Sequence, residues 1–408
     1  MTTSDSARPD QVRAYLDHAA TTPMVPEAIA VMTEQLALGG NPSSLHASGR
    51  RARRTVEESR ELVADLLGAR PSEVVFMSGG TEADNLAAKG LFWARRDADP
   101  SRTRILAPAI EHHALLDPLI WLAKHEGADV ELLSVDPTGR LIGSELEASI
   151  ARDPKSIALI SCMWANNEVG TVQPIADVVR LAHEHGIPVH SDAVQAAGHL
   201  EVDFAASGLD AMTVTGHKLG GPTGVGALII DRELSTTPLL HGGGQERDLR
   251  SGTLNTAAIA AFARAVEVTV SRRAAQTARL EGLRDRLVRG VRQAVPDVIV
   301  NGDPQPGGMY RLPNVAHLTF PGCEGDSLLM LLDAQGIECS TGSACSAGVP
   351  QASHVLLAMG YDDLAARGSL RLSLGHSSTE ADVDSFLEAL PAIHERAHAA
   401  ALAGVRGR

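Results

Sequence analysis

The strongest constraint on the fold is an alternation of short apolar runs with helical patterns through the first two thirds of the chain. Between many of the runs, apolar residues recur at three- and four-residue spacing, as in Thr55–Leu67, His113–Lys124 and Ile175–Glu184. Strands that alternate with helices form βαβ units, so the pattern predicts an α/β fold with a mostly parallel sheet flanked by helices. The runs that we interpret as strands are Val74–Met77, Ile105–Ala107, Val130–Ser134, Ile157–Cys162, Val189–Ser191, Met212–Thr215 and Val225–Ile230.

The pattern changes at about Thr256, where a long helical stretch runs towards Ala294. Shorter strands and helices follow it, at Val315–Phe320, Ser327–Ala334, Leu370–Leu374 and Thr379–His394. A chain of 408 residues has room for more than one domain. We therefore expect a large domain over residues 16–262 and a smaller α+β domain that combines residues 1–15 with 263–408.

Charge and composition exclude several classes of function. The chain has 36 basic and 50 acidic residues, a net charge of −14, and such a surface repels a phosphate backbone. Aromatic residues make up only 3% of the chain, too few for base-stacking platforms. No apolar stretch approaches the roughly 18 residues that a membrane helix needs. We expect neither direct nucleic-acid contact nor membrane insertion.

The ends and the cysteines favour a cytoplasmic protein. The segment Met1–Asp10 is polar and lacks the apolar centre of a signal peptide. The four cysteines do not suggest a disulfide framework, and no C-x-x-C pair suggests a metal site. We therefore expect a cytoplasmic location and no bound metal.

Lys218 lies in the glycine-flanked segment Gly216–Pro222, directly after the predicted strand Met212–Thr215. In open α/β sheets, ligands bind beyond the carboxyl ends of the strands. The spacing of a phosphate-binding P-loop is absent, which leaves the lysine amine as a group able to form a Schiff base with an aldehyde. The alternative is a solvated lysine in a surface turn.

Asp192 directly follows the buried strand Val189–Ser191. A buried carboxylate needs a cationic partner, and the protonated pyridine nitrogen of pyridoxal phosphate would serve. The alternative is a helix N-cap, a position where Asp is favoured.

Glycine-rich turns provide candidate phosphate sites. Gly79, Gly80 and Thr81 lie between the strand Val74–Met77 and a helical pattern, where backbone N–H groups can face an anion. The alternative is an ordinary strand–turn–helix with Thr81 as the cap. A second pair of turns, at 241–247 and 250–253, either adds a phosphate donor or is only a crossover loop.

Two further strands are followed by residues suited to a flat cofactor ring. His112 comes after Ile105–Ala107 and can stack on a ring and transfer protons. With His113 it could instead bind a metal, although no H-E-x-x-H pattern supports this. The amides of Asn166 and Asn167 could bond a ring oxygen or a substrate, or simply form a turn.

The predicted small domain carries two more chemical groups. Cys345 lies in a run of small residues, 340–348, which suits an exposed thiol that must travel. Arg371 occupies an otherwise apolar strand, so it needs an anionic partner, and its planar fork suits a substrate carboxylate. The alternative for Arg371 is a solvated edge position. Cys162, Cys323 and Cys339 are interpreted as structural.

Taken together, these motifs resemble the pyridoxal-phosphate-dependent cysteine desulfurases of the NifS/IscS type, within the class V aminotransferase family. The resemblance extends from the segment 15–23 to about Leu390. Its most specific parts are Ser78–Asn85, Gly216–Lys218, Arg250–Thr253 and Gly342–Cys345. It implies pyridoxal-phosphate fold type I, with a large α/β domain and a small domain carrying the catalytic cysteine loop.

The resemblance also implies a role for each matched residue. Lys218 would bind the cofactor covalently, Asp192 would pair with its ring nitrogen and His112 would stack on its ring. Arg371 and Asn167 would bind the substrate carboxylate. The remaining implied contacts are Asn167 and Gln195 near the ring hydroxyl, Gly80, Thr81, Thr215 and His217 at the phosphate, and Thr253 at the phosphate of a partner subunit.

The implied reaction converts L-cysteine to L-alanine and leaves the sulfur as a persulfide on the nucleophile, Cys345. Thr253 implies a homodimer, and protein acceptors for iron–sulfur cluster assembly or tRNA thiolation would receive the sulfur. An aminotransferase, a selenocysteine lyase or a catalytically silent scaffold remain as alternatives. His376 departs from the arginine that many members have there, so we assign it no role.

Overall fold

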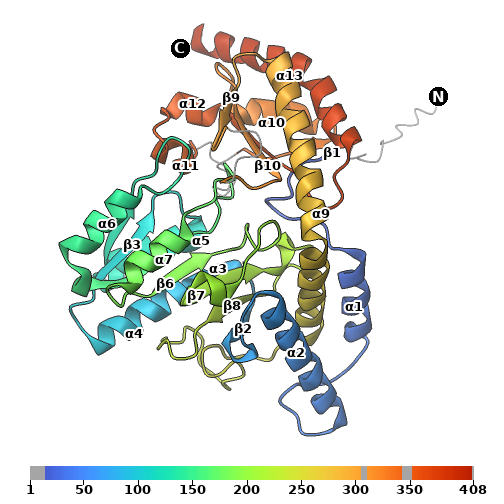
Figure 1. Cartoon of the computed structure of the whole chain (residues 1–408). Helices are drawn as coiled ribbons and strands as arrows, with labels where there is room; N and C mark the ends of the chain where they lie inside the picture. Colours follow the sequence, from blue (N-terminus) through green and yellow to red (C-terminus); the bar gives the residue numbers. More distant parts are fainter. Residues whose placement is uncertain (1–13, 305–309, 342–351, 407–408) are drawn as a thin grey trace.

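The computed structural model describes residues 14–304, 310–341 and 352–406. Cys345 lies outside the described residues, as does most of the small-residue run around it. Figure 1 shows a large sheet flanked by helices, with a second group of strands and helices beside it. The long helix α9 (Thr256–Ala294) extends from one group to the other.

A seven-stranded sheet organises the large part of the molecule, in the order β2-β8-β7-β6-β5-β3-β4. All strands are parallel except β8, which runs antiparallel to both of its neighbours. The prediction of a mostly parallel sheet is therefore confirmed. The strand bounds are β2 (Val74–Met77), β3 (Arg104–Pro108), β4 (Asp129–Leu133), β5 (Ile157–Ser161), β6 (Val189–Asp192), β7 (Ala211–Thr215) and β8 (Gly226–Ile230).

Both faces of this sheet are covered, and its strands, apart from the edge strand β4, are buried along their whole length. One face packs in a core with Val63, Val178 and Ile259, on α2, α7 and α9. The other face packs against Leu91 and Leu115, on α4 and α5. The helix bounds are α1 (Pro26–Leu36), α2 (Ala47–Leu66), α3 (Gly80–Asn85), α4 (Leu91–Ala98), α5 (His113–Glu126), α6 (Gly143–Arg152), α7 (Ile175–His183) and α8 (Phe204–Ser207).

The smaller part is built on an antiparallel sheet in the order β12-β10-β9, and a two-stranded parallel ribbon joins β1 to β11. Its strands are β1 (Ala14–Tyr15), β9 (Ile299–Asn301), β10 (Val315–Thr319), β11 (Ile337–Glu338) and β12 (Ser369–Ser373). Its helices are α10 (Gly325–Asp333), α11 (His354–Ala358), α12 (Asp363–Arg367) and α13 (Glu380–Arg406).

Helix α9 belongs to two hydrophobic cores. Its first half, including Phe262, packs on the large sheet, whereas Leu280 and Leu287 pack in the core of the smaller part. Ala14 and Leu16 join that second core from the beginning of the described chain. The division at residues 262 and 263 thus falls inside one continuous helix, and it stays a prediction.

Candidate active site

The carboxyl ends of the parallel strands surround a cavity of about 340 Å³. The motifs that follow β2, β3, β5, β6 and β7 all contribute to its lining, and Arg371 joins them from β12. The predicted site residues that line it are Gly80, Thr81, His112, Asn167, Asp192, Gln195, Thr215, His217, Lys218 and Arg371. Strands of one direction end at one edge, so residues more than a hundred positions apart converge there.

Lys218 ends the 3₁₀ turn η4 (Gly216–Lys218), which directly continues β7. Its Nζ donates hydrogen bonds to the backbone carbonyls of Ala19 and Ala20, at 2.5 and 2.6 Å. The amine is therefore held at a fixed point of the cavity wall rather than in a solvated turn. The carbonyls of Ala19 and Ala20 are contacts that the sequence analysis missed.

Asp192 is buried at the end of β6, and its Oδ1 accepts a hydrogen bond from the Val194 N–H at 2.8 Å. This bond closes a local turn; no helix begins at Asp192, so the helix N-cap of the alternative interpretation is not observed. The carboxyl also lines the cavity. Burial raises its pKa to about 6, against the opposing effects of the Val194 bond and the charge of Lys218. A cation seated beside it would hold Asp192 in its ionised form.

His112 precedes α5 and caps it, because its Nδ1 accepts a hydrogen bond from the Ala114 N–H at 3.1 Å. Burial, with the nearby charge of Lys218, lowers the pKa of His112 to about 4, so the ring is neutral at pH 7. The proton of a neutral ring whose Nδ1 is an acceptor lies on Nε2. The cap thus fixes both the orientation and the tautomer of this ring.

The start of α3 lines the cavity with Gly80 and Thr81. Gly79 has φ +152° and offers no side-chain cap, and a Cβ added to Gly80 would lie 3.2 Å from Val194 Cγ2 and 3.7 Å from the Thr215 Cβ on β7. The chain continues through the π-helical turn η2 (Leu86–Gly90) into α4, so the first N–H groups belong to a long helix. An uncapped helix start beside a buried hydroxyl suits a phosphate.

His217 and Thr81 also line the cavity. The His217 Nδ1 lies 3.1 Å from the Thr21 hydroxyl. Burial, followed by the charge of Lys218, lowers the pKa of His217 to about 4. It therefore meets a ligand as a neutral hydrogen-bonding ring.

Arg371 extends from the smaller sheet to the cavity. Its Nη2 donates to Oδ1 of Asp17 at 2.9 Å and its Nη1 to the backbone carbonyl of Asn167 at 3.2 Å. Its buried Nε has no hydrogen-bond partner among the described residues. The anionic partner that the sequence analysis expected is thus present as Asp17, which that analysis missed, and one buried donor is left for a ligand.

Asn166 and Asn167 have different roles in the structure. The Asn166 side chain is buried, and its Oδ1 accepts from the N–H groups of Glu168 and Val169, so it forms the turn of the alternative interpretation. Asn167 lines the cavity instead. Gln195 also lines it, and its Nε2 donates to the Ala19 carbonyl at 2.9 Å.

Thr253 is exposed and does not line the cavity. Its neighbour Arg250 donates from Nε to Glu82 of α3 at 3.0 Å, which holds the 250–253 loop near the start of that helix. An exposed Thr253 agrees with the prediction that it serves a partner subunit, which stays a prediction.

The cysteines of the described chain are free and buried. Burial raises the pKa of the Cys323 thiol to about 11 and that of Cys339 to about 12, and it also raises the pKa of Cys162 well above its usual value. None is a thiolate at neutral pH, in agreement with structural positions. Within the described ranges, no cluster of His, Cys, Asp and Glu suits a metal ion, and no helix is long and apolar enough to cross a membrane.

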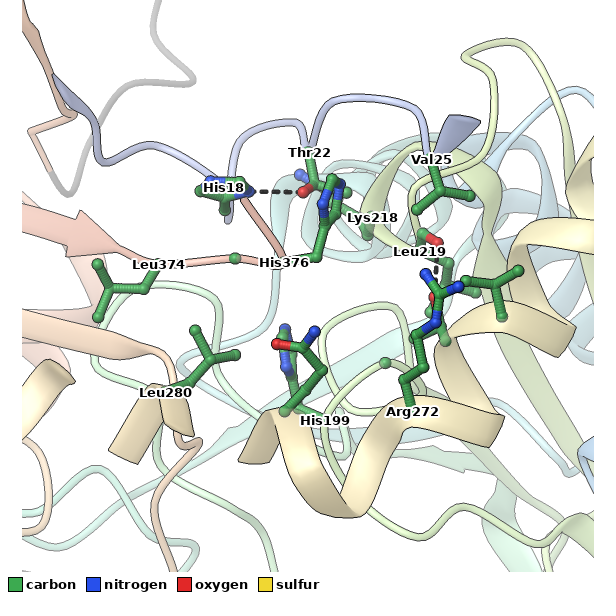
Figure 2. A pocket seen from close by; sticks show the side chains of 15 residues that line it. His18, Thr22, Val25, His199, Lys218, Leu219, Arg272, Leu280, Leu374 and His376 are labelled. Atoms are coloured by element: carbon green, nitrogen blue, oxygen red, sulfur yellow. Dashed lines mark hydrogen bonds between the residues drawn. The ribbon is translucent and has the colours of Figure 1, made fainter. Parts of the chain in front are cut away.

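A second, smaller cavity of about 60 Å³ lies on another side of Lys218, between the two parts of the molecule (Figure 2). It is lined by His18 and His199, and by His376 from the segment after β12. The His376 ring bonds the Pro23 carbonyl at 2.8 Å. This residue, which departs from the family pattern, therefore contributes to the contact between the two parts.

Comparison with known proteins identifies the family. The model of the class V aminotransferases matches residues 14–386. An IscS-like cysteine desulfurase of Mycobacterium tuberculosis is 58% identical over 390 residues, which cover 96% of this chain and 98% of that protein. Cysteine desulfurase IscS of Methanosarcina thermophila is 42% identical, over 94% of this chain and 92% of its own.

Comparison with solved structures indicates the same family. A NifS-like protein from Rickettsia africae superposes with a TM-score of 0.84 at 32% identity, covering 94% of this chain and 99% of its own. The chain therefore belongs to the class V aminotransferase family. Within that family it is a cysteine desulfurase of the IscS-like type, which acts on L-cysteine and uses pyridoxal 5'-phosphate.

The residues of the cavity fit this cofactor. A lysine amine, a buried carboxylate at Asp192, the flat ring of His112 and the uncapped start of α3 all line the cavity. The unpartnered Nε of Arg371 offers a donor for a substrate carboxylate. These are the chemical groups that an aldehyde, a pyridine nitrogen, a phosphate and an amino acid require.

Proposed function

We propose that this enzyme takes sulfur from L-cysteine onto Cys345, with the cavity residues in the roles that the family resemblance implies. One observation carries the proposal: Lys218, Asp192, His112 and Arg371 line the same cavity. Lys218 holds pyridoxal phosphate through its amine and Asp192 pairs with the ring nitrogen. When bound, the cofactor supplies an electron sink that weakens the bonds at the substrate Cα.

The other contacts orient the two ligands. Gly80, Thr81, Thr215 and His217 bind the phosphate. His112 would stack on the ring, and Gln195 and Asn167 would contact the ring hydroxyl. Arg371 binds the substrate carboxylate, supported by its anchoring to Asp17. Such a clamp fixes the direction of the Cα–H bond relative to Lys218.

Lys218, once the substrate amine has displaced it from the cofactor, accepts the proton from Cα of the substrate at its Nζ and returns a proton to the carbon skeleton. The Cys345 thiolate attacks the substrate sulfur, the carbon–sulfur bond breaks, and a persulfide forms on Cys345. The carbon skeleton takes up protons and leaves as alanine. Overall, L-cysteine and a thiol give L-alanine and a persulfide, which balances without an added oxidant or reductant.

The next steps are also proposals. The persulfide passes to protein acceptors that serve iron–sulfur cluster assembly or tRNA thiolation. The enzyme acts as a homodimer in which Thr253 reaches the phosphate of the partner subunit, as its exposure beside the Arg250–Glu82 bond supports. Free cysteines at all three described positions support a reducing compartment, and we propose the cytoplasm.

Mass spectrometry of the persulfide tests the sulfur step. The enzyme is incubated with L-cysteine, alkylated and digested, and the mass of one added sulfur is sought on each cysteine-containing peptide. We expect it on the peptide of Cys345, with the buried Cys323 and Cys339 as internal controls. Sulfur on either control, or its continued capture by the Cys345→Ser variant, would refute the assignment.

A further inference from the structure

Helix α11 of the smaller part packs on the large part through a small hydrophobic core of its own. Val355 and Leu356 of α11 lie in that core with Ile110, Met163 and Val169. Met163 also lines the cavity of the proposed active site. The two parts of the molecule are therefore joined at the cavity by a contact to which the proposed mechanism gives no role.

Two polar contacts hold the start of α11 in this position. The Ser353 hydroxyl donates to Oε2 of Glu168 at 2.5 Å, and both side chains are buried. Nε2 of His354 bonds the backbone carbonyl of Glu111 at 2.9 Å. Because Glu168 directly follows Asn167, which lines the cavity, the bond from Ser353 ends one residue away from the proposed substrate site.

The Ser353 hydroxyl makes a second bond, within the smaller part. Its Oγ accepts from the Leu356 N–H at 3.1 Å, so Ser353 is also the N-cap of α11. One hydroxyl thus begins the helix and joins its start to Glu168. Any test of the link to Glu168 must therefore separate it from the loss of a helix cap.

The chain on the other side of Cys345 is anchored at the same cavity. Ser340 and Arg371 exchange backbone hydrogen bonds at 2.7 and 3.2 Å, and the Arg371 side chain lines the cavity. In the sequence, Cys345 lies between Ser340 and Ser353, outside the described residues. The two described ends of the segment that carries Cys345 are therefore bound to Arg371 and to the residue after Asn167.

The turn that contains Glu168 has supports of its own. Asn166 donates from Nδ2 to the Ile110 carbonyl at 3.0 Å, and its Oδ1 accepts from the N–H groups of Glu168 and Val169. These bonds do not involve Ser353. Loss of the Ser353 hydroxyl should therefore leave this turn in place and release only the start of α11.

We propose that Glu168 and Ser353 are positioning residues, whose hydrogen bond fixes one end of the segment carrying Cys345 beside the substrate site so that the thiol can reach the substrate sulfur. This inference rests on the proposed role of Cys345 as the nucleophile. It assigns the bond to the sulfur step alone, because binding of L-cysteine and removal of its Cα proton use Arg371 and Lys218.

Two rates measured with the holoenzyme test this assignment. The first is formation of the persulfide on the Cys345 peptide in a single turnover, followed by mass spectrometry. The second is exchange of the Cα hydrogen of L-cysteine for deuterium from D₂O, measured in Cys345→Ala, where the sulfur step is blocked. A misplacement of about 1 Å can slow a reaction about a hundredfold. We expect Ser353→Ala to slow the first rate about tenfold or more and to change the second less than about twofold.

Three variants separate the link from the cap. Asp362 caps the neighbouring helix α12 through the Ala365 N–H at 2.8 Å, so Asp362→Ala is the matched control and should leave both rates unchanged. Glu168→Gln keeps an acceptor for the Ser353 hydroxyl and should form persulfide within about twofold of the wild type. Glu168→Leu removes the acceptor and should be as slow as Ser353→Ala, and combining these two substitutions should cause no further loss.

The outcomes distinguish this inference from the proposed function. Persulfide formation by Ser353→Ala at the wild-type rate, or equal slowing of both rates, would overturn the inference alone. Independent losses from Glu168→Leu and Ser353→Ala that multiply in the double variant would also overturn it. A wild type that forms no persulfide on Cys345 would refute the proposed function, and this inference with it.

Discussion

Arg371 and Asp17 lie 354 residues apart in the chain, and Nη2 of the arginine donates to Oδ1 of the aspartate at 2.9 Å. The pair joins the strand β12 to the segment that follows β1, at the wall of the cavity. Both side chains are largely shielded from solvent, so the contact holds the guanidinium rather than merely neutralising it.

Loss of this anchor should weaken substrate binding. We expect Asp17→Asn to raise KM for L-cysteine about tenfold with a smaller change in kcat, because a charged hydrogen bond that orients Arg371 is worth about 1.5 kcal/mol. Asp285→Asn is the matched control, since Asp285 holds Arg284 at 2.9 Å without lining the cavity. Equal KM values for the two variants would contradict this account of Arg371.

The contact between His18 and Gly375 should tolerate no side chain. A Cβ on Gly375 would lie 2.0 Å from Nδ1 of His18, whose ring also bonds Thr22 at 2.5 Å. We expect Gly375→Ala to lower stability by about 2 kcal/mol or more, measured as a drop in Tm. Gly282→Ala is the control: nothing lies within 4 Å of its added Cβ in α9, and it should gain about 1 kcal/mol. A Gly375→Ala variant as stable as the wild type would show that this packing is wrong.

Glu168 should make the protein less stable as the pH rises. Burial raises its pKa to about 7, even though the Ser353 hydroxyl donates to its Oε2 at 2.5 Å. The unfolded state therefore loses this proton first, and stability falls between about pH 4.5 and 7, by up to about 3 kcal/mol.

Denaturant unfolding at pH 5 and pH 8 measures this effect. Glu168→Gln cannot ionise, so its stability relative to the wild type should rise between these two pH values. Ser353→Ala removes a hydrogen bond that favours the Glu168 anion. In that variant the fall in stability should therefore continue to higher pH than in the wild type. A pH-independent difference between Glu168→Gln and the wild type would mean that Glu168 ionises normally.

His317 should have the opposite effect on stability, making the protein less stable as the pH falls. The ring is buried on β10, its Nδ1 bonds Asn301 at 2.8 Å, and burial lowers its pKa to about 3. Below about pH 6.5 the unfolded state takes up a proton that the folded state refuses, so stability falls as the pH drops. Between pH 7 and 5 this costs the wild type about 2 kcal/mol, a loss that His317→Gln should avoid. If the free energies of unfolding of the wild type and His317→Gln changed equally between pH 7 and 5, this account of His317 would be wrong.

Much of the fold could be predicted because the strands are buried on both faces. The run Val74–Met77 was predicted with the observed bounds of β2. The observed strand β3 is longer than the predicted run Ile105–Ala107 by one residue at each end. Where the chain reverses, the signal is weaker: nothing in the sequence of β8 distinguishes it as the antiparallel strand.

The site was predictable where a motif follows a strand, as for Lys218 and Asp192, since local order places both at one edge. Residues that are distant in the sequence and meet only in the folded chain could not be predicted in this way. Asp17 lies 354 residues from the arginine that it holds, and nothing in the sequence marks the two as partners. The cap that fixes the His112 tautomer was likewise visible only in the structure.

Alanine released from L-cysteine in the presence of a reductant tests the central claim most directly, with the wild type and Cys345→Ala compared at equal cofactor loading. The account predicts alanine from the wild type and none above background from the variant. Equal alanine production by both would contradict the assignment of Cys345 as the nucleophile that takes the sulfur.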